Sequence, residues 1–149
     1  MKIFMIRKFL YFTLLLTVLI HCSSDNVRNK NPFVPNYSFS ITIDTNLPSY
    51  SGLASPVNPQ LITLPNIGAN GIIVMKVSDT DYRAWEANCP NQSITSCSRM
   101  TLVGTNAKCP CDDIEYSLFT GVSATGGAQY TLIPYRIEVV SNRVIRVYN

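Results

Sequence analysis

Four cysteines in the second half of the chain are the residues best suited to chemistry. They stand in the segments Cys89-Pro90-Asn91, Cys97 and Cys109-Pro110-Cys111-Asp112. Sulfur atoms gathered in this way can hold an iron–sulfur cluster or a zinc ion, or they can be joined as disulfides. The only histidine, His21, lies in an N-terminal segment that we expect to be removed. A histidine-ligated cluster, a histidine-bound zinc and a histidine general base are therefore excluded.

The first residues have the pattern of an export signal. Met1–Lys8 carries three basic residues, and the uncharged apolar run Phe9–Ile20 follows. This run is too short to cross a bilayer, which takes about 20 residues in a helix. A basic start, a short apolar stretch and then a polar chain is typical of a signal peptide. We expect residues 1–21 to be removed, and a retained membrane anchor is the less favoured alternative.

The end of that segment resembles the processing site of bacterial lipoproteins. The resemblance rests on Leu19 and Cys22, whereas His21 departs from the small residue that usually precedes the cysteine. It implies that Cys22 becomes an acylated N-terminus, and several acyl chains on one cysteine would anchor the protein firmly to a membrane. We therefore expect a bacterial cell-envelope protein, lipid-anchored and lying on the periplasmic or outer-membrane face. The alternative is a free secreted protein with an odd cysteine.

The charge balance argues against nucleic acid as a partner. The whole chain has 12 Lys+Arg and 9 Asp+Glu, and three of the basic residues lie in the expected signal. The remaining chain is formally neutral and has no basic stripe. Residues 22–35 are polar, rich in asparagine and end in prolines, which predicts a flexible tether. About 115 residues follow, enough for one domain over residues 36–149.

This domain is predicted to be all-β. Tyr37–Asp44 alternates apolar and polar residues, which places Tyr37, Phe39, Ile41 and Ile43 on one face. Leu61–Leu64 predicts a short strand, Gly71–Val77 a strand covered on both faces, and Tyr82–Ala87 its hairpin partner. Tyr135–Val140 and Arg143–Tyr148 predict a second hairpin with a turn at Ser141-Asn142. Outside the signal, no helical periodicity of ten or more residues is present.

Around the cysteines the sequence resembles a Rieske domain. The resemblance rests on the order of Cys89-Pro90-Asn91, the intervening strands, Cys109-Pro110-Cys111-Asp112 and then Thr120-Gly121. It implies an antiparallel β-sandwich or barrel with two cluster-binding loops on a small subdomain. In that family the loops supply two cysteines to one iron and two histidines to the other. Cys89 and Cys109 match the cysteine ligands, whereas Asn91 and Asp112 occupy the histidine positions. Asp113-Ile114 also replaces a frequent Gly-Ser pair.

We expect these vacated ligand positions to hold no cluster, because an asparagine amide is a poor ligand for iron. A cluster site with two cysteines and Asp112, or with all four cysteines, is the alternative. Zinc knuckles of the usual spacing are absent. Four cysteines in an oxidising compartment otherwise form disulfides. Three pairings exist, and joining Cys109 to Cys111 would be strained, which leaves two. The Rieske resemblance implies Cys89–Cys109 together with an outer brace, Cys97–Cys111.

No catalytic constellation is evident. A serine or cysteine nucleophile has no histidine base, and Asp112, Asp113 and Glu115 are interpreted as solvated loop residues. We expect a non-enzymatic envelope lipoprotein without cofactor, acting as a binding or assembly module for an unidentified envelope protein or ligand. The alternative is an electron-transfer protein holding a [2Fe–2S] cluster with atypical ligands. A thiol–disulfide oxidoreductase is a weaker third hypothesis, because Cys-Pro-Cys is not the Cys-x-x-Cys motif.

Overall fold

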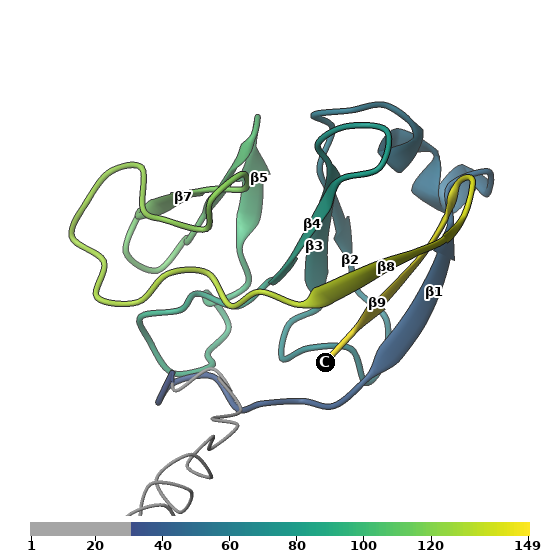
Figure 1. The fold of residues 1–149 in the computed structure, drawn as a ribbon. Helices are drawn as coiled ribbons and strands as arrows, with labels where there is room; N and C mark the ends of the chain where they lie inside the picture. Colours follow the sequence, from purple (N-terminus) through teal and green to yellow (C-terminus); the bar gives the residue numbers. More distant parts are fainter. Residues whose placement is uncertain (1–30) are drawn as a thin grey trace, which may run out of the picture.

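The computed structural model describes residues 31–149, which fold into short antiparallel strands with one 3-10 helix. The expected signal peptide, Cys22 and most of the expected tether lie outside the described residues. The strands form three three-stranded sheets with the orders β1-β9-β8, β2-β3-β4 and β5-β6-β7. Figure 1 shows the first two sheets side by side and the third set apart as a smaller unit. The prediction of an all-β domain is confirmed.

The first sheet contains β1 (Ser40–Asp44), β8 (Arg136–Ser141) and β9 (Val144–Tyr148). β1 begins three residues later than the alternation predicts, and Tyr37 is 39% exposed rather than packed in the core. The turn between β8 and β9 also differs from the prediction, because Ser141 pairs with Val144. A register shift between Val139 and Ser141 leaves Val140 as an extra residue and moves the turn one position along the chain.

The second sheet lies in the centre of the molecule and contains β2 (Gln60–Ile62), β3 (Ile72–Lys76) and β4 (Tyr82–Glu86). The predicted hairpin of β3 and β4 is confirmed, with Ile72 opposite Glu86 and Lys76 opposite Tyr82. Between β1 and β2 lies η2 (Pro48–Ala54), a 3-10 helix that the sequence pattern did not predict. It buries Leu53 in a hydrophobic cluster with Ile43 of β1 and Ile72 of β3.

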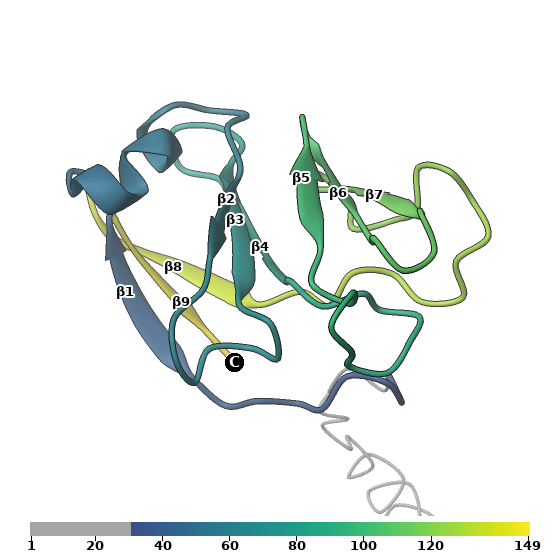
Figure 2. The ribbon, with the colours of Figure 1, turned by 180° about the vertical axis from the view of Figure 1, so that it is seen from behind.

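The third sheet carries the cysteine loops and contains β5 (Thr101–Val103), β6 (Asn106–Lys108) and β7 (Glu115–Ser117). Figure 2 shows these three strands together on the far side of the central sheet from β1. Each is only three residues long, too short for a periodic pattern to predict, and β6 alone is paired on both sides.

Two hydrophobic cores meet at the central sheet. Successive residues of a strand point to opposite faces, so Ile72 and Val74 of β3 enter one core while Ile73 and Met75 enter the other. All four side chains are fully buried, which explains the continuous apolar run at this strand. The first core lies against β1 and β9. The second lies beneath the cysteine loops and contains Met100, Ala107, Tyr116, Leu118 and Leu132 together with both inner cysteines, Cys89 and Cys109.

Trp85 joins the central sheet to the cysteine subdomain. Its indole Nε1–H donates to the carbonyl oxygen of Leu118 at 2.9 Å. Gly121 lies directly over the ring with φ +74°, and a Cβ atom there would stand 2.7 Å from two indole carbons. Only glycine combines this backbone conformation with such a close approach.

Glu86 is a fully buried carboxylate at the end of β4. Its Oε2 accepts hydrogen bonds from the Tyr135 hydroxyl at 2.6 Å and the Ala69 amide at 2.7 Å. Its Oε1 accepts from the amides of Asn88 at 3.0 Å and Asn70 at 3.2 Å. Burial, and next the Glu86 charge, raise the pKa of the Tyr135 phenol well above its ordinary value. These four hydrogen bonds thus compensate the carboxylate for the water that it loses on burial.

The last residues of the expected tether contact the domain. Asn31 and Val34 are buried, and the Asn31 amide donates to the carbonyl oxygen of Pro90 at 2.6 Å. The ring of Phe33 meets that of Tyr130 edge-on, with centroids 5.9 Å apart. The folded unit therefore includes residues 31–34, which composition had placed in the tether. Within the described residues, no helix is long and apolar enough to cross a membrane.

The Glu86 cluster predicts a large loss of stability on replacing Glu86 by glutamine. The new amide NH₂ would face backbone N–H donors, so at least one buried donor loses its acceptor. We expect Glu86→Gln to lower the free energy of unfolding by about 2–4 kcal/mol. Glu138→Gln, on the exposed Glu138–Arg146 pair, is the matched control and should change it by less than about 1 kcal/mol. Urea denaturation of both variants measures this. Equal effects would show that the buried cluster is not important for stability.

Candidate functional site

Two loops, Cys89–Ser98 and Cys109–Ile114, form the candidate site. The first closes on itself through the hydrogen bond from the Cys89 amide to the Ser98 carbonyl at 2.7 Å. The second is closed by the Cys109 amide, which donates to the Ile114 carbonyl at 2.9 Å. The first loop follows β4 and the second connects β6 to β7. The central sheet and the third sheet therefore each supply one loop.

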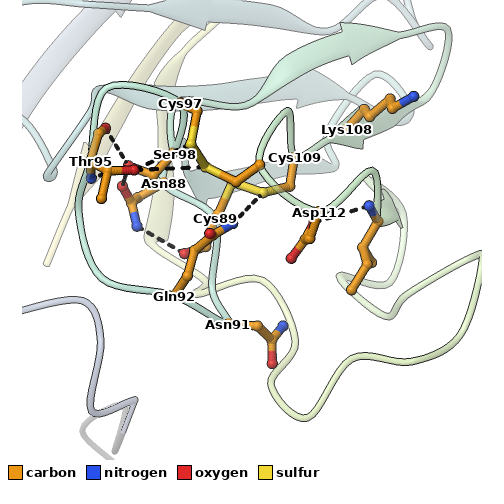
Figure 3. Close-up of a disulfide and its surroundings, with 12 residues drawn as sticks. Asn88, Cys89, Asn91, Gln92, Thr95, Cys97, Ser98, Lys108, Cys109 and Asp112 are labelled. Atoms are coloured by element: carbon orange, nitrogen blue, oxygen red, sulfur yellow. Dashed lines mark hydrogen bonds between the residues drawn. A yellow bond between two sulfur atoms is a disulfide. The ribbon is translucent and has the colours of Figure 1, made fainter.

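The structure joins the two loops by two disulfides, and Figure 3 labels Cys89, Cys97 and Cys109 where the loops meet. The disulfides are Cys89–Cys109, with Cα atoms 5.5 Å apart, and Cys97–Cys111, with Cα atoms 5.3 Å apart. This is the pairing that the Rieske resemblance implied. In the chain-entropy treatment, a bridge that closes a loop of this size contributes roughly 3 kcal/mol. The Cys89–Cys109 disulfide is fully buried in the second core, whereas Cys97 is exposed.

A buried polar network holds the first loop in shape. The Ser98 hydroxyl donates to Asn88 Oδ1 at 2.8 Å and accepts from the Thr95 amide at 2.9 Å. The Asn70 amide donates to the same Asn88 oxygen at 2.6 Å. Asn88 and Ser98 are both buried, so the bond between them is made away from water, and the three bonds together orient the segment that carries Cys97.

The second loop turns at Asp113, which has φ +60°. This left-handed conformation favours glycine, although aspartate is among the residues that tolerate it. The Asp113 amide donates to the Cys109 carbonyl at 3.0 Å, and its carboxylate lies 2.9 Å from Lys108 Nζ. The hydrogen bond and charge of Asp113 raise the pKa of Lys108. The departure from a Gly-Ser pair is therefore accommodated within the loop.

Asn91 uses its whole side chain to tie the first loop to the segment before β8. Its Nδ2 donates to the Tyr116 hydroxyl at 2.7 Å and to the Tyr130 carbonyl at 2.9 Å. Its Oδ1 accepts from the amides of Tyr130 at 2.8 Å and Gln129 at 2.9 Å. Burial raises the pKa of the Tyr116 phenol, and the Asn91 hydrogen bond opposes that rise. All the hydrogen-bonding capacity of Asn91 is thus used within the protein.

Asp112 has a simpler role. Its Oδ1 accepts from the Ile114 amide at 3.0 Å, a turn that the side chain closes on its own backbone. The residue is exposed. Neither vacated position offers a metal ligand comparable to histidine. Asn91 is engaged in four hydrogen bonds, and the Asp112 carboxylate accepts a hydrogen bond from its own loop.

These residues do not fit the ligand set of a Rieske cluster. Both sulfurs that would bind the first iron are joined to each other, and the second iron would meet an amide and a carboxylate in place of two imidazoles. The sulfur atoms of Cys89, Cys109 and Cys111 do lie within 4.8 Å of one another. Each belongs to a disulfide, and a disulfide sulfur is not a thiolate ligand.

Some of the site was not predicted from the sequence. The Gln92 side-chain amide donates a hydrogen bond to Cys109 Sγ at 2.8 Å. The Asn31 side-chain amide donates one to the Pro90 carbonyl, 59 residues further along the chain. Neither contact has a sequence signal, because each joins residues far apart in the chain through an ordinary polar side chain. The expected brace between Cys97 and Cys111, by contrast, follows from the Rieske-like order of the motifs.

Comparisons with known proteins give only structural neighbours. No family model matches the chain, and no curated protein matches it. The chain is similar to a chain of the oxygenase–ferredoxin complex of carbazole 1,9a-dioxygenase, with 21% identity over 76% of this chain and 94% of that one, at a TM-score of 0.48. It is also similar to the ferredoxin of carbazole 1,9a-dioxygenase from Nocardioides aromaticivorans IC177, with 13% identity over 75% and 97% and a TM-score of 0.47.

A third neighbour is the quaternary ammonium Rieske monooxygenase CntA, with 13% identity over 79% of this chain and a TM-score of 0.48. This chain spans 34% of that protein. Likeness of this degree does not assign a function. The arrangement described above, with three antiparallel sheets and two cysteine loops joined at their tips, is nevertheless that of a Rieske-like domain. The fold is Rieske-like.

The bonds of Asn91 predict a local effect of its removal. Asn91→Ala should lower the free energy of unfolding by about 1–2 kcal/mol, because the buried Tyr116 hydroxyl loses its partner and the half-buried Tyr130 amide its acceptor. It should also speed hydrogen exchange at the Gln129 and Tyr130 amides, which lose their acceptor. Asn106→Ala, which removes one bond to Glu115 at 3.1 Å, is the control and should leave those two amides unchanged. Unchanged exchange in Asn91→Ala would contradict the proposed tie.

Proposed function

We propose that this protein is a non-enzymatic, lipid-anchored protein of the bacterial envelope whose Rieske-like domain binds a partner without an iron–sulfur cluster. The observation that carries the proposal is that the side chains at all four ligand positions are bonded within the protein. Cys89 and Cys109 are bonded to each other, Asn91 is saturated with hydrogen bonds, and Asp112 closes its own turn. Each position supports the loops rather than offering a donor to a metal.

The disulfides take over the mechanical role of a cluster in this proposal. A cluster bound by both loops would hold their tips together, and two covalent bridges do the same without metal or electron transfer. The outer surface of the loops is then free to act as a binding face. Its exposed apolar residue, Ile94, is 41% exposed within the first loop. The partner we propose is another envelope protein or ligand.

Anchoring would place this binding face near the membrane. The Asn31 contact attaches the chain to the first cysteine loop at Pro90. Nine residue steps separate an acylated Cys22 from Asn31, and a fully extended chain of that length reaches about 30 Å. If Cys22 carries the lipid, the cysteine loops stay within roughly that distance of the acyl chains. A partner in or at the same membrane is therefore favoured over a freely diffusing one.

A second function has one observation in its favour. The sulfurs of Cys89, Cys109 and Cys111 lie within 4.8 Å of one another, so reduction of both disulfides would gather three thiols. An electron-transfer protein with atypical ligands would use these thiols and a fourth group. Such a site requires both bridges to open, which makes it secondary to the binding module.

Anchoring is tested by Cys22→Ser in the full-length chain expressed in a bacterium with an envelope. We expect the unchanged protein to sediment with membranes and Cys22→Ser to lose that association. Ser23→Ala is the neighbouring control and should stay in the membrane fraction. Mass spectrometry of the N-terminal peptide should show acylated Cys22. An unmodified Cys22, or an intact residue 1–21 segment, would contradict the proposal.

Metal content separates the two functions. Protein purified without oxygen from the envelope should be colourless and contain less than one iron and one acid-labile sulfide per chain, because the histidine positions are occupied by Asn91 and Asp112. The control is Cys89→Ser, which removes a sulfur common to the two sites considered above, one with two cysteines and Asp112 and the other with all four cysteines. Stoichiometric iron and sulfide that disappear in Cys89→Ser would establish the electron-transfer alternative instead.

A further inference from the structure

The two disulfides differ in their access to solvent. Cys89 and Cys109 are both 0% exposed, whereas Cys97 is exposed and Cys111 is half-buried. A dissolved thiol can therefore reach the outer bridge but not the inner one. Exposure is one of the factors that set the rate of thiol–disulfide exchange.

Hydrogen-bond donors already lie beside the sulfurs of both bridges. The Thr95 hydroxyl lies 3.4 Å from Cys97 Sγ and 3.7 Å from Cys111 Sγ. The Gln92 amide donates to Cys109 Sγ at 2.8 Å, a contact drawn in Figure 3. A donor beside a sulfur stabilises the thiolate that forms there when the disulfide opens.

We propose that the Cys97–Cys111 disulfide is a thiol-exchange site for a dithiol partner, and that Cys111 then carries the exchange to the buried Cys89–Cys109 disulfide. The inference goes beyond the binding function proposed above and does not depend on lipid anchoring. It assigns a redox role to the cysteines that the spacing Cys-Pro-Cys alone did not predict.

The first step takes place at the exposed sulfur. A thiolate of the dithiol partner attacks Cys97 Sγ, the Cys97–Cys111 bond breaks, and Cys111 leaves as a thiolate beside the Thr95 hydroxyl. The second thiol of the partner, once deprotonated, attacks the partner's first sulfur, which is bonded to Cys97 in the mixed disulfide. Cys97 leaves as a thiolate and takes up a proton. The partner loses two electrons and becomes a disulfide, while Cys97 is reduced to a thiol and Cys111 to the thiolate that acts in the next step.

The second step is an isomerisation within the protein and needs no further reductant. Cys111 Sγ lies within 4.8 Å of the sulfurs of Cys89 and Cys109. Attack on Cys109 would join two cysteines separated by a single residue, which is strained. Attack on Cys89 forms Cys89–Cys111 and releases the Cys109 thiolate, which the Gln92 amide already contacts. One disulfide breaks as one forms, so no net electrons are transferred.

A pair of single variants of the full-length chain tests this path. In Cys97→Ser, Cys111 begins as a free thiol and can attack Cys89. Trapping with a fast alkylating reagent at acid pH, followed by peptide mapping, should find part of the label on Cys109 and a Cys89–Cys111 bridge. In Cys111→Ser, the free thiol is Cys97, which lies outside the group of three sulfurs, and the label should stay on Cys97. Label confined to Cys111 in a folded Cys97→Ser protein would overturn the relay.

Gln92→Leu in the Cys97→Ser background isolates the donor. Loss of a hydrogen bond to the leaving sulfur should lower the fraction of Cys109 that is labelled by roughly 2- to 10-fold, and an unchanged fraction would contradict the role of Gln92. The unchanged protein supplies a test that needs no folded variant. Under graded dithiothreitol, Cys97 should be labelled first, Cys111 and Cys109 should share the second label, and Cys89 should be labelled last. Simultaneous labelling of all four cysteines would show that the outer bridge is not the entry point.

Discussion

The buried Cys89–Cys109 disulfide is the interaction on which the cysteine subdomain depends. The strands of the third sheet are three residues long, and such short strands have little stability of their own. The disulfide fixes the loop after β4 to the loop after β6 and lies in the second core with Met100, Tyr116 and Leu132. Covalent closure thus compensates for a core too small to hold three short strands by packing alone.

The polar groups around this bridge follow from the same constraint. Loops that leave buried strands bring backbone amides into the interior, and these amides require acceptors. Glu86 accepts a hydrogen bond from an amide of the loop before β3, and Ser98 accepts one from Thr95 within the first cysteine loop. Asn91 accepts hydrogen bonds from the amides of residues 129 and 130. In each case a side-chain oxygen accepts the hydrogen bond that the carbonyl of a neighbouring strand would accept in a sheet. These hydrogen bonds hold the loops in the shape described above.

The sequence predicted six of the nine strands in residues 31–149, β1 to β4, β8 and β9, some with shifted ends, whereas β5 to β7 and η2 were not predicted. β3 has an apolar run set by two cores, and a turn signal separates it from β4, so their hairpin could be recognised from the sequence. The turn at residues 142–143 was misplaced by one residue, because a bulge near Val140 leaves no trace in an alternating pattern. The short strands β5 to β7 and η2 had no detectable period. The contact of Asn31 with Pro90 joins residues 59 positions apart, a separation at which local patterns carry no information.

The sequence by itself limited the side chains that this chain can offer to a metal. The absence of histidine beyond residue 21, the four cysteines and their spacing exclude an imidazole-ligated cluster whatever the fold. The elimination of a strained Cys109–Cys111 bridge left two pairings open. Only the tertiary structure decided how the sulfurs are arranged in space, with one pair buried, the other reaching the surface at Cys97, and three of the four atoms within 4.8 Å. The physical reason is that bonding and burial depend on how two loops from different sheets meet, which residue types and spacing along one chain do not specify.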